Sequence, residues 1–226
     1  MQTDTITADH LIEAYAAGIF PMAASRDDLT LRWIDPKLRG ILPLDRIIVP
    51  QRLRKTLRQG RFTVTINVAF EDVMRACAAP RDSADDTWIN EPIIRMYTEL
   101  HGRGRAHSVE VWQDNVMVGG LYGVHLGAAY FGESMFSTAR DASKVALVHL
   151  LARLKMRGFL LCDTQFLTPH LAQFGGIEIP RAAYHVRLNE ALQKDVQFAS
   201  LADGTTAGNA ALVGAFAAGL ATGTAD

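Results

Sequence analysis

The sequence has few of the residues that build metal centres and disulfide frameworks. Its 226 residues include only two cysteines, Cys77 and Cys162, whose number and spacing suit neither a zinc site nor a set of disulfides. A reducing compartment is therefore expected. The seven histidines include no His-x-His or His-Glu-x-x-His pair, so no metal site is predicted. Gly-x-Ser-x-Gly, Gly-x-x-x-x-Gly-Lys and Gly-x-Gly-x-x-Gly motifs are also missing, which argues against the common hydrolase, P-loop and dinucleotide-binding classes.

Long apolar runs and an excess of one charge are missing as well. The most apolar stretch, residues 145–161, is interrupted by one histidine and three basic residues, which indicates a core helix and a strand rather than a membrane span. The first residues contain Asp4 and no basic side chain, so we expect no signal peptide and a cytoplasmic location. Lys and Arg number 23 against 24 Asp and Glu, which excludes nucleic-acid binding through bulk positive charge. Any site for a polyanion must be local.

The composition that remains is typical of a soluble globular protein, with 49% hydrophobic residues and a mean hydropathy of +0.06. Hydrophobic periodicity predicts helices and strands in a mixed order, with an antiparallel meander in the middle of the chain. Helices are expected at residues 8–17, 51–59, 69–79, 91–101 and 141–157, after Thr168, and up to Leu192. Strands are expected at residues 62–66, 107–113, 116–124, 127–133, 159–163 and 177–179, with short ones between 31 and 50.

This order of elements predicts an α+β protein in which helices pack on a mixed sheet. We expect a small α/β N-terminal domain at residues 1–65 and a catalytic domain at residues 66–198. Residues 199–226 form a tail of mostly Ala, Gly and Thr, which we expect to be disordered, with a weak helix at residues 210–220 as the alternative.

Polar residues follow the buried strand that ends near residue 163. The period of two along a strand places the side chains of Asp163 and Gln165 on one face. A carboxylate beside an amide can accept from the amide NH₂ and polarise its carbonyl oxygen, which then binds the proton of an attacking amine more strongly. The commoner meaning of such a tripeptide is a solvated strand end. A structure in which the two side chains diverge would leave this hypothesis without its polarising pair.

Glu133 is a lone acid among aromatic residues and methionine, so burial would make it seek a cation or stay protonated. An ordinary ion pair with Arg140 is the alternative. Leu121, Tyr122 and neighbouring apolar residues could line a pocket, although such stripes are more often core.

A basic run occupies the predicted helix at residues 51–59 and could bind phosphate, although a solvated helix face is the commoner meaning. Its members are Arg52, Arg54, Lys55 and Arg58, followed by Arg61. His170 lies at a predicted helix start, where a lone histidine is usually structural, and it is given no role.

Taken together, the motifs resemble the bacterial leucyl/phenylalanyl-tRNA–protein transferase family over about residues 8–192. Departures are few: Pro50-Gln51-Arg52-Leu53 and Gly175-Gly176 differ from the usual segments, and the Ala/Gly tail is extra. The blocks that carry the resemblance are Tyr15 to Met22, Trp33, Pro36, Arg39-Gly40, Leu42-Pro43, Thr87 to Ile89, Ala106 to Trp112, Val118 to Val124, Phe131 to Ser137, Ala142 to Lys144, Asp163 to Gln165, His170-Leu171 and Glu178 to Arg181.

The resemblance implies an aminoacyltransferase. Such an enzyme moves Leu or Phe, and less readily Met, from aminoacyl-tRNA to the α-amino group of proteins with N-terminal Arg or Lys, which marks them for degradation by the N-degron route. It also implies an acetyltransferase-like (GNAT-type) catalytic domain. Because an aminoacyl ester is converted to a peptide downhill, no ATP, metal or other cofactor is expected, and catalysis can depend on positioning.

The resemblance further implies roles for particular residues. Gln165 would accept a hydrogen bond from the attacking amine, Asp163 would polarise Gln165, and Glu133 would hold the cationic acceptor or the amino end of the donor. Trp33 and Trp88 would stack on the terminal adenosine of tRNA, and Arg52, Arg54, Lys55 and Arg58 would contact its phosphates. The pocket for the donor side chain would include Leu121, Tyr122, Met135, Leu147 and Leu150.

Two other classes of function are compatible with the same elements. An acyl-CoA-dependent N-acyltransferase would need a glycine-rich pyrophosphate loop, but the corresponding stretch at residues 137–141 has no glycine. A non-catalytic tRNA-binding module would lack the Asp163 and Gln165 pair, which is present.

Overall fold

The computed structural model describes residues 6–28, 30–80, 87–198 and 216. The predicted disorder of residues 199–226, and the alternative helix there, lie outside this part of the chain, except that Phe216 is helical and buried in the core.

A seven-stranded sheet forms the centre of the molecule, with the strand order β4-β5-β6-β7-β8-β3-β9. Only β7 and β8 are paired in parallel, and every other neighbouring pair is antiparallel. The strands are β3 (Leu38–Ile41), β4 (Thr63–Ile66), β5 (Ala106–Gln113), β6 (Val116–Leu126), β7 (Ala129–Ser137), β8 (Leu161–Gln165) and β9 (Ile177–Pro180).

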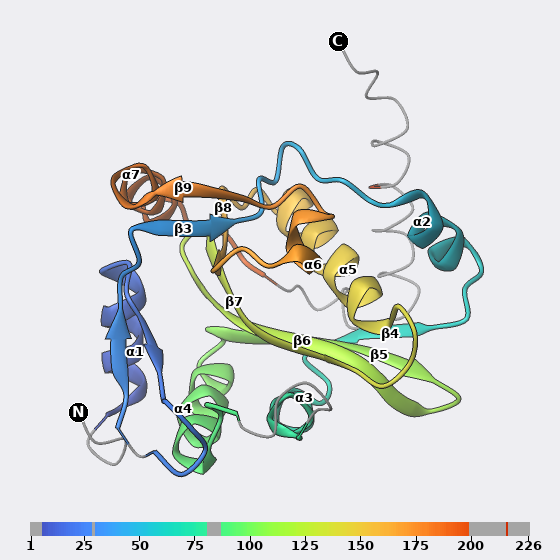
Figure 1. Cartoon of the computed structure of the whole chain (residues 1–226), viewed down its shortest axis with the longest axis horizontal. Helices are drawn as coiled ribbons and strands as arrows, with labels where there is room; N and C mark the ends of the chain where they lie inside the picture. The colour runs from blue at the N-terminus through green and yellow to red at the C-terminus, as the bar shows by residue number, and fades with distance from the viewer. Residues whose placement is uncertain (1–5, 29, 81–86, 199–215, 217–226) are drawn as a thin grey trace.

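Helices cover both faces of this sheet (Figure 1). The long helix α5 (Ala142–Met156) packs on β5 and β6 from one side, where the short α6 (Pro169–Ala172) and α2 (Gln51–Arg58) also lie. On the other side are α3 (Phe70–Ala78) and α4 (Glu91–Gly102). The last helix, α7 (Arg181–Leu192), packs beside β3 and β9.

The N-terminal segment forms a small unit beside the sheet (Figure 1). It contains α1 (Ala8–Ala16) and a two-stranded sheet of β1 (Phe20–Met22) and β2 (Arg32–Ile34). Thr7 caps α1 by accepting from the backbone N–H of His10, and Gly18 follows the helix with φ +80°, a value that favours glycine. The helix therefore begins and ends where its sequence predicts.

The predicted meander is confirmed, because β5, β6 and β7 are consecutive antiparallel neighbours. The turn between β5 and β6 consists of Asp114 and Asn115, both with positive φ, as a tight hairpin requires. The predicted α+β class and mixed sheet are also confirmed. However, β3 lies before the predicted domain boundary at residues 65 and 66, and β4 crosses it, yet both belong to the large sheet, so strands from both sides of the boundary share one sheet. No helix within the described ranges is long and apolar enough to span a membrane.

Candidate active site

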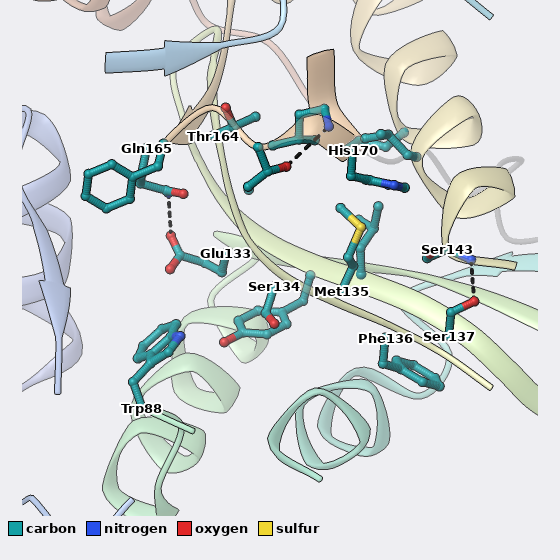
Figure 2. Close-up of a pocket in the computed structure, with 18 of the residues that line it drawn as sticks. Trp88, Glu133, Ser134, Met135, Phe136, Ser137, Ser143, Thr164, Gln165 and His170 are labelled. Carbon is teal, nitrogen blue, oxygen red and sulfur yellow. Dashed lines mark hydrogen bonds between the residues drawn. The ribbon is translucent and has the colours of Figure 1, made fainter. Parts of the chain in front are cut away.

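The site lies where the two parallel strands part. β7 and β8 are paired only from Ala129 to Phe131 and from Leu161 to Asp163. Beyond this point β7 continues along β6, whereas Gln165 of β8 lies opposite Gly40 of β3. A pocket of about 940 Å³ is lined by the separated strand ends, by α5 and by the N-terminal segment. Figure 2 shows Gln165 and Glu133 on facing sides of it.

A shift in strand register turns Glu133 into this pocket. Gly132 pairs with Gly123 and Ser134 pairs with Tyr122, so Glu133 is an extra residue with no partner on β6. Such bulges locally redirect a side chain. Tyr15 of α1 donates to Oε1 of Glu133 at 2.6 Å.

Two further groups contact Glu133. Tyr97 of α4 donates to Oε2 at 3.4 Å, and the hydroxyl oxygens of Tyr15 and Tyr97 are 2.5 Å apart. The amide Nε2 of Gln165 donates to Oε1 at 3.4 Å. Arg140, the alternative ion-pair partner of Glu133, instead pairs with Asp141, with its Nε 3.9 Å from Oδ2 of Asp141. Glu133 is thus held by neutral donors.

The surroundings of Glu133 favour its protonated form. Desolvation raises the pKa of Glu133 from 4.5 to about 8, and the negative charge of Asp163 acts in the same direction, while the hydrogen bond from Tyr15 opposes the shift. A carboxyl group with this pKa exchanges its proton near neutral pH, which suits proton transfer to and from a substrate.

The structure corrects the expected contact between the side chains of Asp163 and Gln165. Thr164 is an extra residue in the pairing with β3, and Gln165 has φ +57°, so the alternation along β8 is broken. The two side chains diverge. Asp163 is fully buried away from the pocket and accepts from the backbone N–H of Gln165 at 2.8 Å. The carboxylate that contacts the Gln165 amide is that of Glu133.

Asp163 binds residues that sequence reasoning had not connected to the site. Arg39 of β3 donates from Nε to Oδ1 at 2.9 Å and from Nη2 to Oδ2 at 2.6 Å. The hydroxyl of Tyr184 donates to Oδ2 at 2.9 Å. Arg39 belongs to one of the blocks that carry the family resemblance, but nothing in the local sequence indicates a partner more than a hundred residues away.

The predicted apolar wall lies around the pocket, where Leu121 and Met135 line the side formed by β6 and β7, and Leu147 and Leu150 of α5 line another. Tyr122, although fully buried, also belongs to the lining. Lining residues for which the sequence predicted no role there include Phe20, Pro21, Met22, Cys162, Thr164, Phe166 and His170. His170 is half-buried, and its Nε2 atom has no hydrogen-bond partner within the described chain.

The two tryptophans expected to stack on adenosine are not equivalent. Trp88 lines the main pocket and also a neighbouring one of about 460 Å³. Trp33 lines neither of them, and it is partly buried against the core, paired with Pro21 of β1. The structure therefore brings Trp88 to the site and does not bring Trp33 there.

The basic helix α2 presents its charges away from the pocket. Arg52, Arg54, Lys55 and Arg58 are all exposed, and none of them lines the pocket. Arg54 is partly engaged, because its Nε donates to the carbonyl oxygen of Val49 at 2.9 Å. In the described ranges no ion pair involves any of the four. Likewise, no cluster of His, Cys, Asp and Glu that could hold a metal ion occurs in that part of the chain.

Comparisons with known proteins point to one family. Residues 41–189 match the family described as leucyl/phenylalanyl-tRNA protein transferase, and residues 4–37 match its N-terminal domain. A protein named leucyl/phenylalanyl-tRNA–protein transferase from Paramagnetospirillum magneticum is 60% identical over 85% of this chain and 92% of its own length. A protein of the same name from Caulobacter vibrioides is 57% identical over 90% of this chain and 94% of its own length. The chain belongs to the leucyl/phenylalanyl-tRNA protein transferase family.

Proposed function

We propose that this protein transfers Leu or Phe, and less readily Met, from aminoacyl-tRNA to the α-amino group of proteins with N-terminal Arg or Lys. The observation that carries the proposal is a single pocket with leucine side chains from β6 and α5 on its wall and the Glu133 and Gln165 pair beside them. The relatives' name supports the donor, since it states leucyl/phenylalanyl-tRNA.

The reaction needs an uncharged amine close to the ester. The α-amine attacks the ester carbonyl carbon, a C–N bond forms and the bond to the ribose oxygen breaks. One proton leaves the amine, and one ends on the ribose hydroxyl. Gln165 accepts the amine N–H through its amide oxygen while its NH₂ group donates to Glu133.

Glu133 takes the polarising role first considered for Asp163. Its pKa of about 8 lies close to the ordinary α-amino pKa of about 7.7–8.0, so proton transfer from the incoming ammonium to its carboxylate is nearly balanced. Glu133 is the one carboxyl group among the described lining residues of the pocket, and its deprotonated form also attracts the cationic acceptor. Asp163 does not contact the substrate and acts indirectly, by accepting from the backbone N–H of Gln165.

The pocket selects the donor side chain by shape. Leu121, Met135, Leu147 and Leu150 offer apolar walls that suit Leu, Phe and Met. Side chains branched at Cβ, such as Ile and Val, place an extra methyl group near the backbone, and we expect them to be accepted less readily.

The tRNA body is bound outside the pocket. Trp88 stacks on the terminal adenosine, and the exposed charges of α2 contact phosphates of the acceptor stem, which makes recognition largely independent of tRNA sequence. A stacking role for Trp33 remains a prediction from the resemblance, without support from its position. We further propose that the product is marked for N-degron degradation in the cytoplasm, and that the parted β7 and β8 belong to an acetyltransferase-like fold.

The proposal is tested by incubating the protein with Leu-tRNA carrying labelled Leu and a peptide that begins with Arg. Label in the peptide is expected, with less transfer to a matched peptide that begins with Asp. Acetyl-CoA replaces Leu-tRNA in a parallel reaction. Acetyl transfer without Leu transfer would favour the acyl-CoA enzyme, and tRNA binding without transfer would favour the binding module.

A further inference from the structure

We infer that Arg39 is a positioning residue for the transfer reaction, which together with Gly40 holds the tight turn at Gln165 in the orientation that presents its amide to the reacting amine. This inference rests on the proposed function of Gln165. It concerns a side chain that does not itself line the pocket.

Arg39 is enclosed, and hydrogen bonds hold its guanidinium in place. Its side chain is 1% exposed, and both edges of the guanidinium are used. One edge makes the two-point contact with Asp163, and Nη1 donates to the carbonyl oxygen of Gly18 at 2.9 Å. The rings of Phe20 and Tyr184 lie on the guanidinium at 4.6 Å and 4.3 Å from their centroids. Such a side chain has one orientation.

Asp163 transmits this orientation to Gln165. Oδ1 of Asp163 accepts from Nε of Arg39 and also from the backbone N–H of Gln165. The carboxylate therefore joins a fixed guanidinium to the main chain of the residue whose amide faces the pocket. A bidentate, charge-assisted contact fixes position as well as contributing energy.

The turn at Gln165 needs such support. Gln165 has φ +57°, which is unfavourable for a residue other than glycine. The N–H of Phe166 donates to the carbonyl oxygen of Thr164 at 2.6 Å, so Gln165 is the central residue of a three-residue turn. Strained backbone of this kind persists where the surroundings determine it, and it is common at reacting sites.

Gly40 holds the same turn from its other side. A Cβ atom at position 40 would lie 2.5 Å from the carbonyl carbon of Phe166 and 2.6 Å from the nitrogen of Leu167. Both are backbone atoms, so the turn itself would have to move. The adjacent residues Arg39 and Gly40 thus act on one turn, the first by hydrogen bonding and the second by leaving space.

A contribution to stability alone does not explain this arrangement. A buried ion pair is often no more stabilising than apolar residues of the same size, whereas loss of one partner leaves an uncompensated charge. Fixing the orientation of Gln165 gives the pair a function. The contact with Gly18 also joins Arg39 to the segment that follows α1, which helps to fix the orientation of the guanidinium.

The test uses Arg39→Lys, which keeps the charge and removes the two-point contact. We expect kcat for Leu transfer to the Arg-initiated peptide to fall about tenfold to a hundredfold, with KM for Leu-tRNA within about twofold. The matched control is Arg153→Lys, because Arg153 is also 1% exposed and also lies over an aromatic ring, that of Phe198, but its Nη1 donates to the carbonyl oxygen of Phe198 rather than to Asp163. The control is expected to keep kcat. Thermal unfolding of both variants separates lost folding from lost rate.

Two further measurements make the inference falsifiable. In a Gln165→Ala background, Arg39→Lys should lower the rate no further, because Arg39 acts only through Gln165. The inference would be overturned if Arg39→Lys lowered kcat in the Gln165→Ala background by as large a factor as it does in the wild type. It would also be overturned if kcat of Arg39→Lys alone stayed within about twofold of the wild-type value. Gly40→Ala should reproduce the loss of kcat.

The side-chain amide resonance of Gln165, identified by its loss in Gln165→Ala, provides a readout that needs no activity. It should move in Arg39→Lys and stay in place in Arg153→Lys. If the resonance moves but the protein transfers no amino acid, the positioning role is retained and the proposed function is rejected. If the resonance does not move but the enzyme is active, the proposed function is retained and the positioning role is rejected.

Discussion

Two glutamates in the same sheet show how similar chemistry has different consequences. Glu110 of β5 is fully buried, and its carboxylate accepts from the hydroxyls of Thr65 at 2.6 Å and Ser108 at 2.5 Å and from the backbone N–H of Ala69 at 3.4 Å. Ala69 precedes α3, so Glu110 also lies at the start of that helix, where a negative charge is favourable. It does not line the pocket.

Glu133 of β7 is equally surrounded by neutral donors but faces an open pocket. One of its donors, the Gln165 amide, lines the same pocket, where we propose that its carbonyl oxygen accepts from the incoming amine. Hydrogen bonds from hydroxyl groups to a buried acid therefore do not identify it as a reacting group. Contact with the open pocket, together with a neighbouring amide that can bind the substrate, distinguishes Glu133 from Glu110. The same comparison tells which substitutions should affect the rate and which should affect only the fold.

The largest expected effect follows from removing the amide that distinguishes the two sites. Gln165→Ala should lower kcat for transfer about a hundredfold to a thousandfold, because an oriented hydrogen-bonding group at the reacting amine is lost. Affinity for Leu-tRNA, measured by filter binding, should stay within about twofold, since no phosphate contact is removed. Equal losses of affinity and rate would contradict the role given to Gln165.

Glu133→Gln should lower the rate about tenfold to a hundredfold and remove the part of its pH dependence that Glu133 contributes. In the wild type the rate should rise with pH as the carboxylate forms, around the pKa of about 8. Measurement of kcat from about pH 6 to about pH 9.5 checks this, with Gln165→Ala as the comparison that keeps the carboxyl. A variant with an unchanged profile would exclude Glu133 as the proton acceptor.

The same substitution should stabilise the fold. Because the folded-state pKa of Glu133 is raised, from 4.5 to about 8, the folded protein binds a proton that the unfolded chain has released in this range. The free energy of unfolding therefore falls as the pH rises through that window. Glu133→Gln has no such loss and should exceed the wild-type stability by up to a few kcal/mol above about pH 8, as urea unfolding at several pH values would report.

Reversal of the exposed charges of α2 should have an intermediate effect. Arg52→Glu, Lys55→Glu and Arg58→Glu together should weaken Leu-tRNA binding about tenfold at low salt and flatten its dependence on salt, with kcat at saturation nearly unchanged. Arg54 is left in place because it bonds to Val49. Reversal of the exposed Arg95 and Arg187 is the matched control. Unchanged affinity at low salt would mean that α2 is an ordinary solvated helix.

The smallest effect on the rate is expected at the other glutamate. Glu110→Gln should keep kcat/KM within about twofold while lowering the free energy of unfolding by about 1–3 kcal/mol, because its buried hydrogen bonds are no longer all satisfied. The change in urea midpoint measures the loss. A rate loss as large as that of Glu133→Gln would remove the distinction between the two acids.

The sequence predicts much of the fold because most elements follow from local patterns. The Asp114 and Asn115 turn predicts its hairpin, and the mostly apolar stretch that forms α5 predicts a buried helix, in both cases from neighbouring residues. The position of β3 between β8 and β9 could not be predicted in this way, because its partners lie more than a hundred residues further along the chain.

The sequence predicts several residues that line the pocket and does not predict their contacts. Leu121 and Met135, taken from the resemblance, line the pocket, and their role in binding the donor stays a prediction. The alternation argument for Asp163 and Gln165 was wrong because Thr164 is an extra residue, and a single such residue moves every following side chain to the other face. Bulges carry no local sequence signal here, and neither does the pairing of Arg39 with Asp163.

The bond from Tyr15 to Glu133 spans 118 positions of sequence, and Arg39 contacts Gly18 from the start of the large sheet. The first forty residues therefore supply parts of the reacting centre, and are not merely attached to it. A single proteolytic nick between β2 and β3 would leave each fragment without an essential half. Fragments that stay associated are expected to keep these contacts, and fragments that separate are expected to lose them.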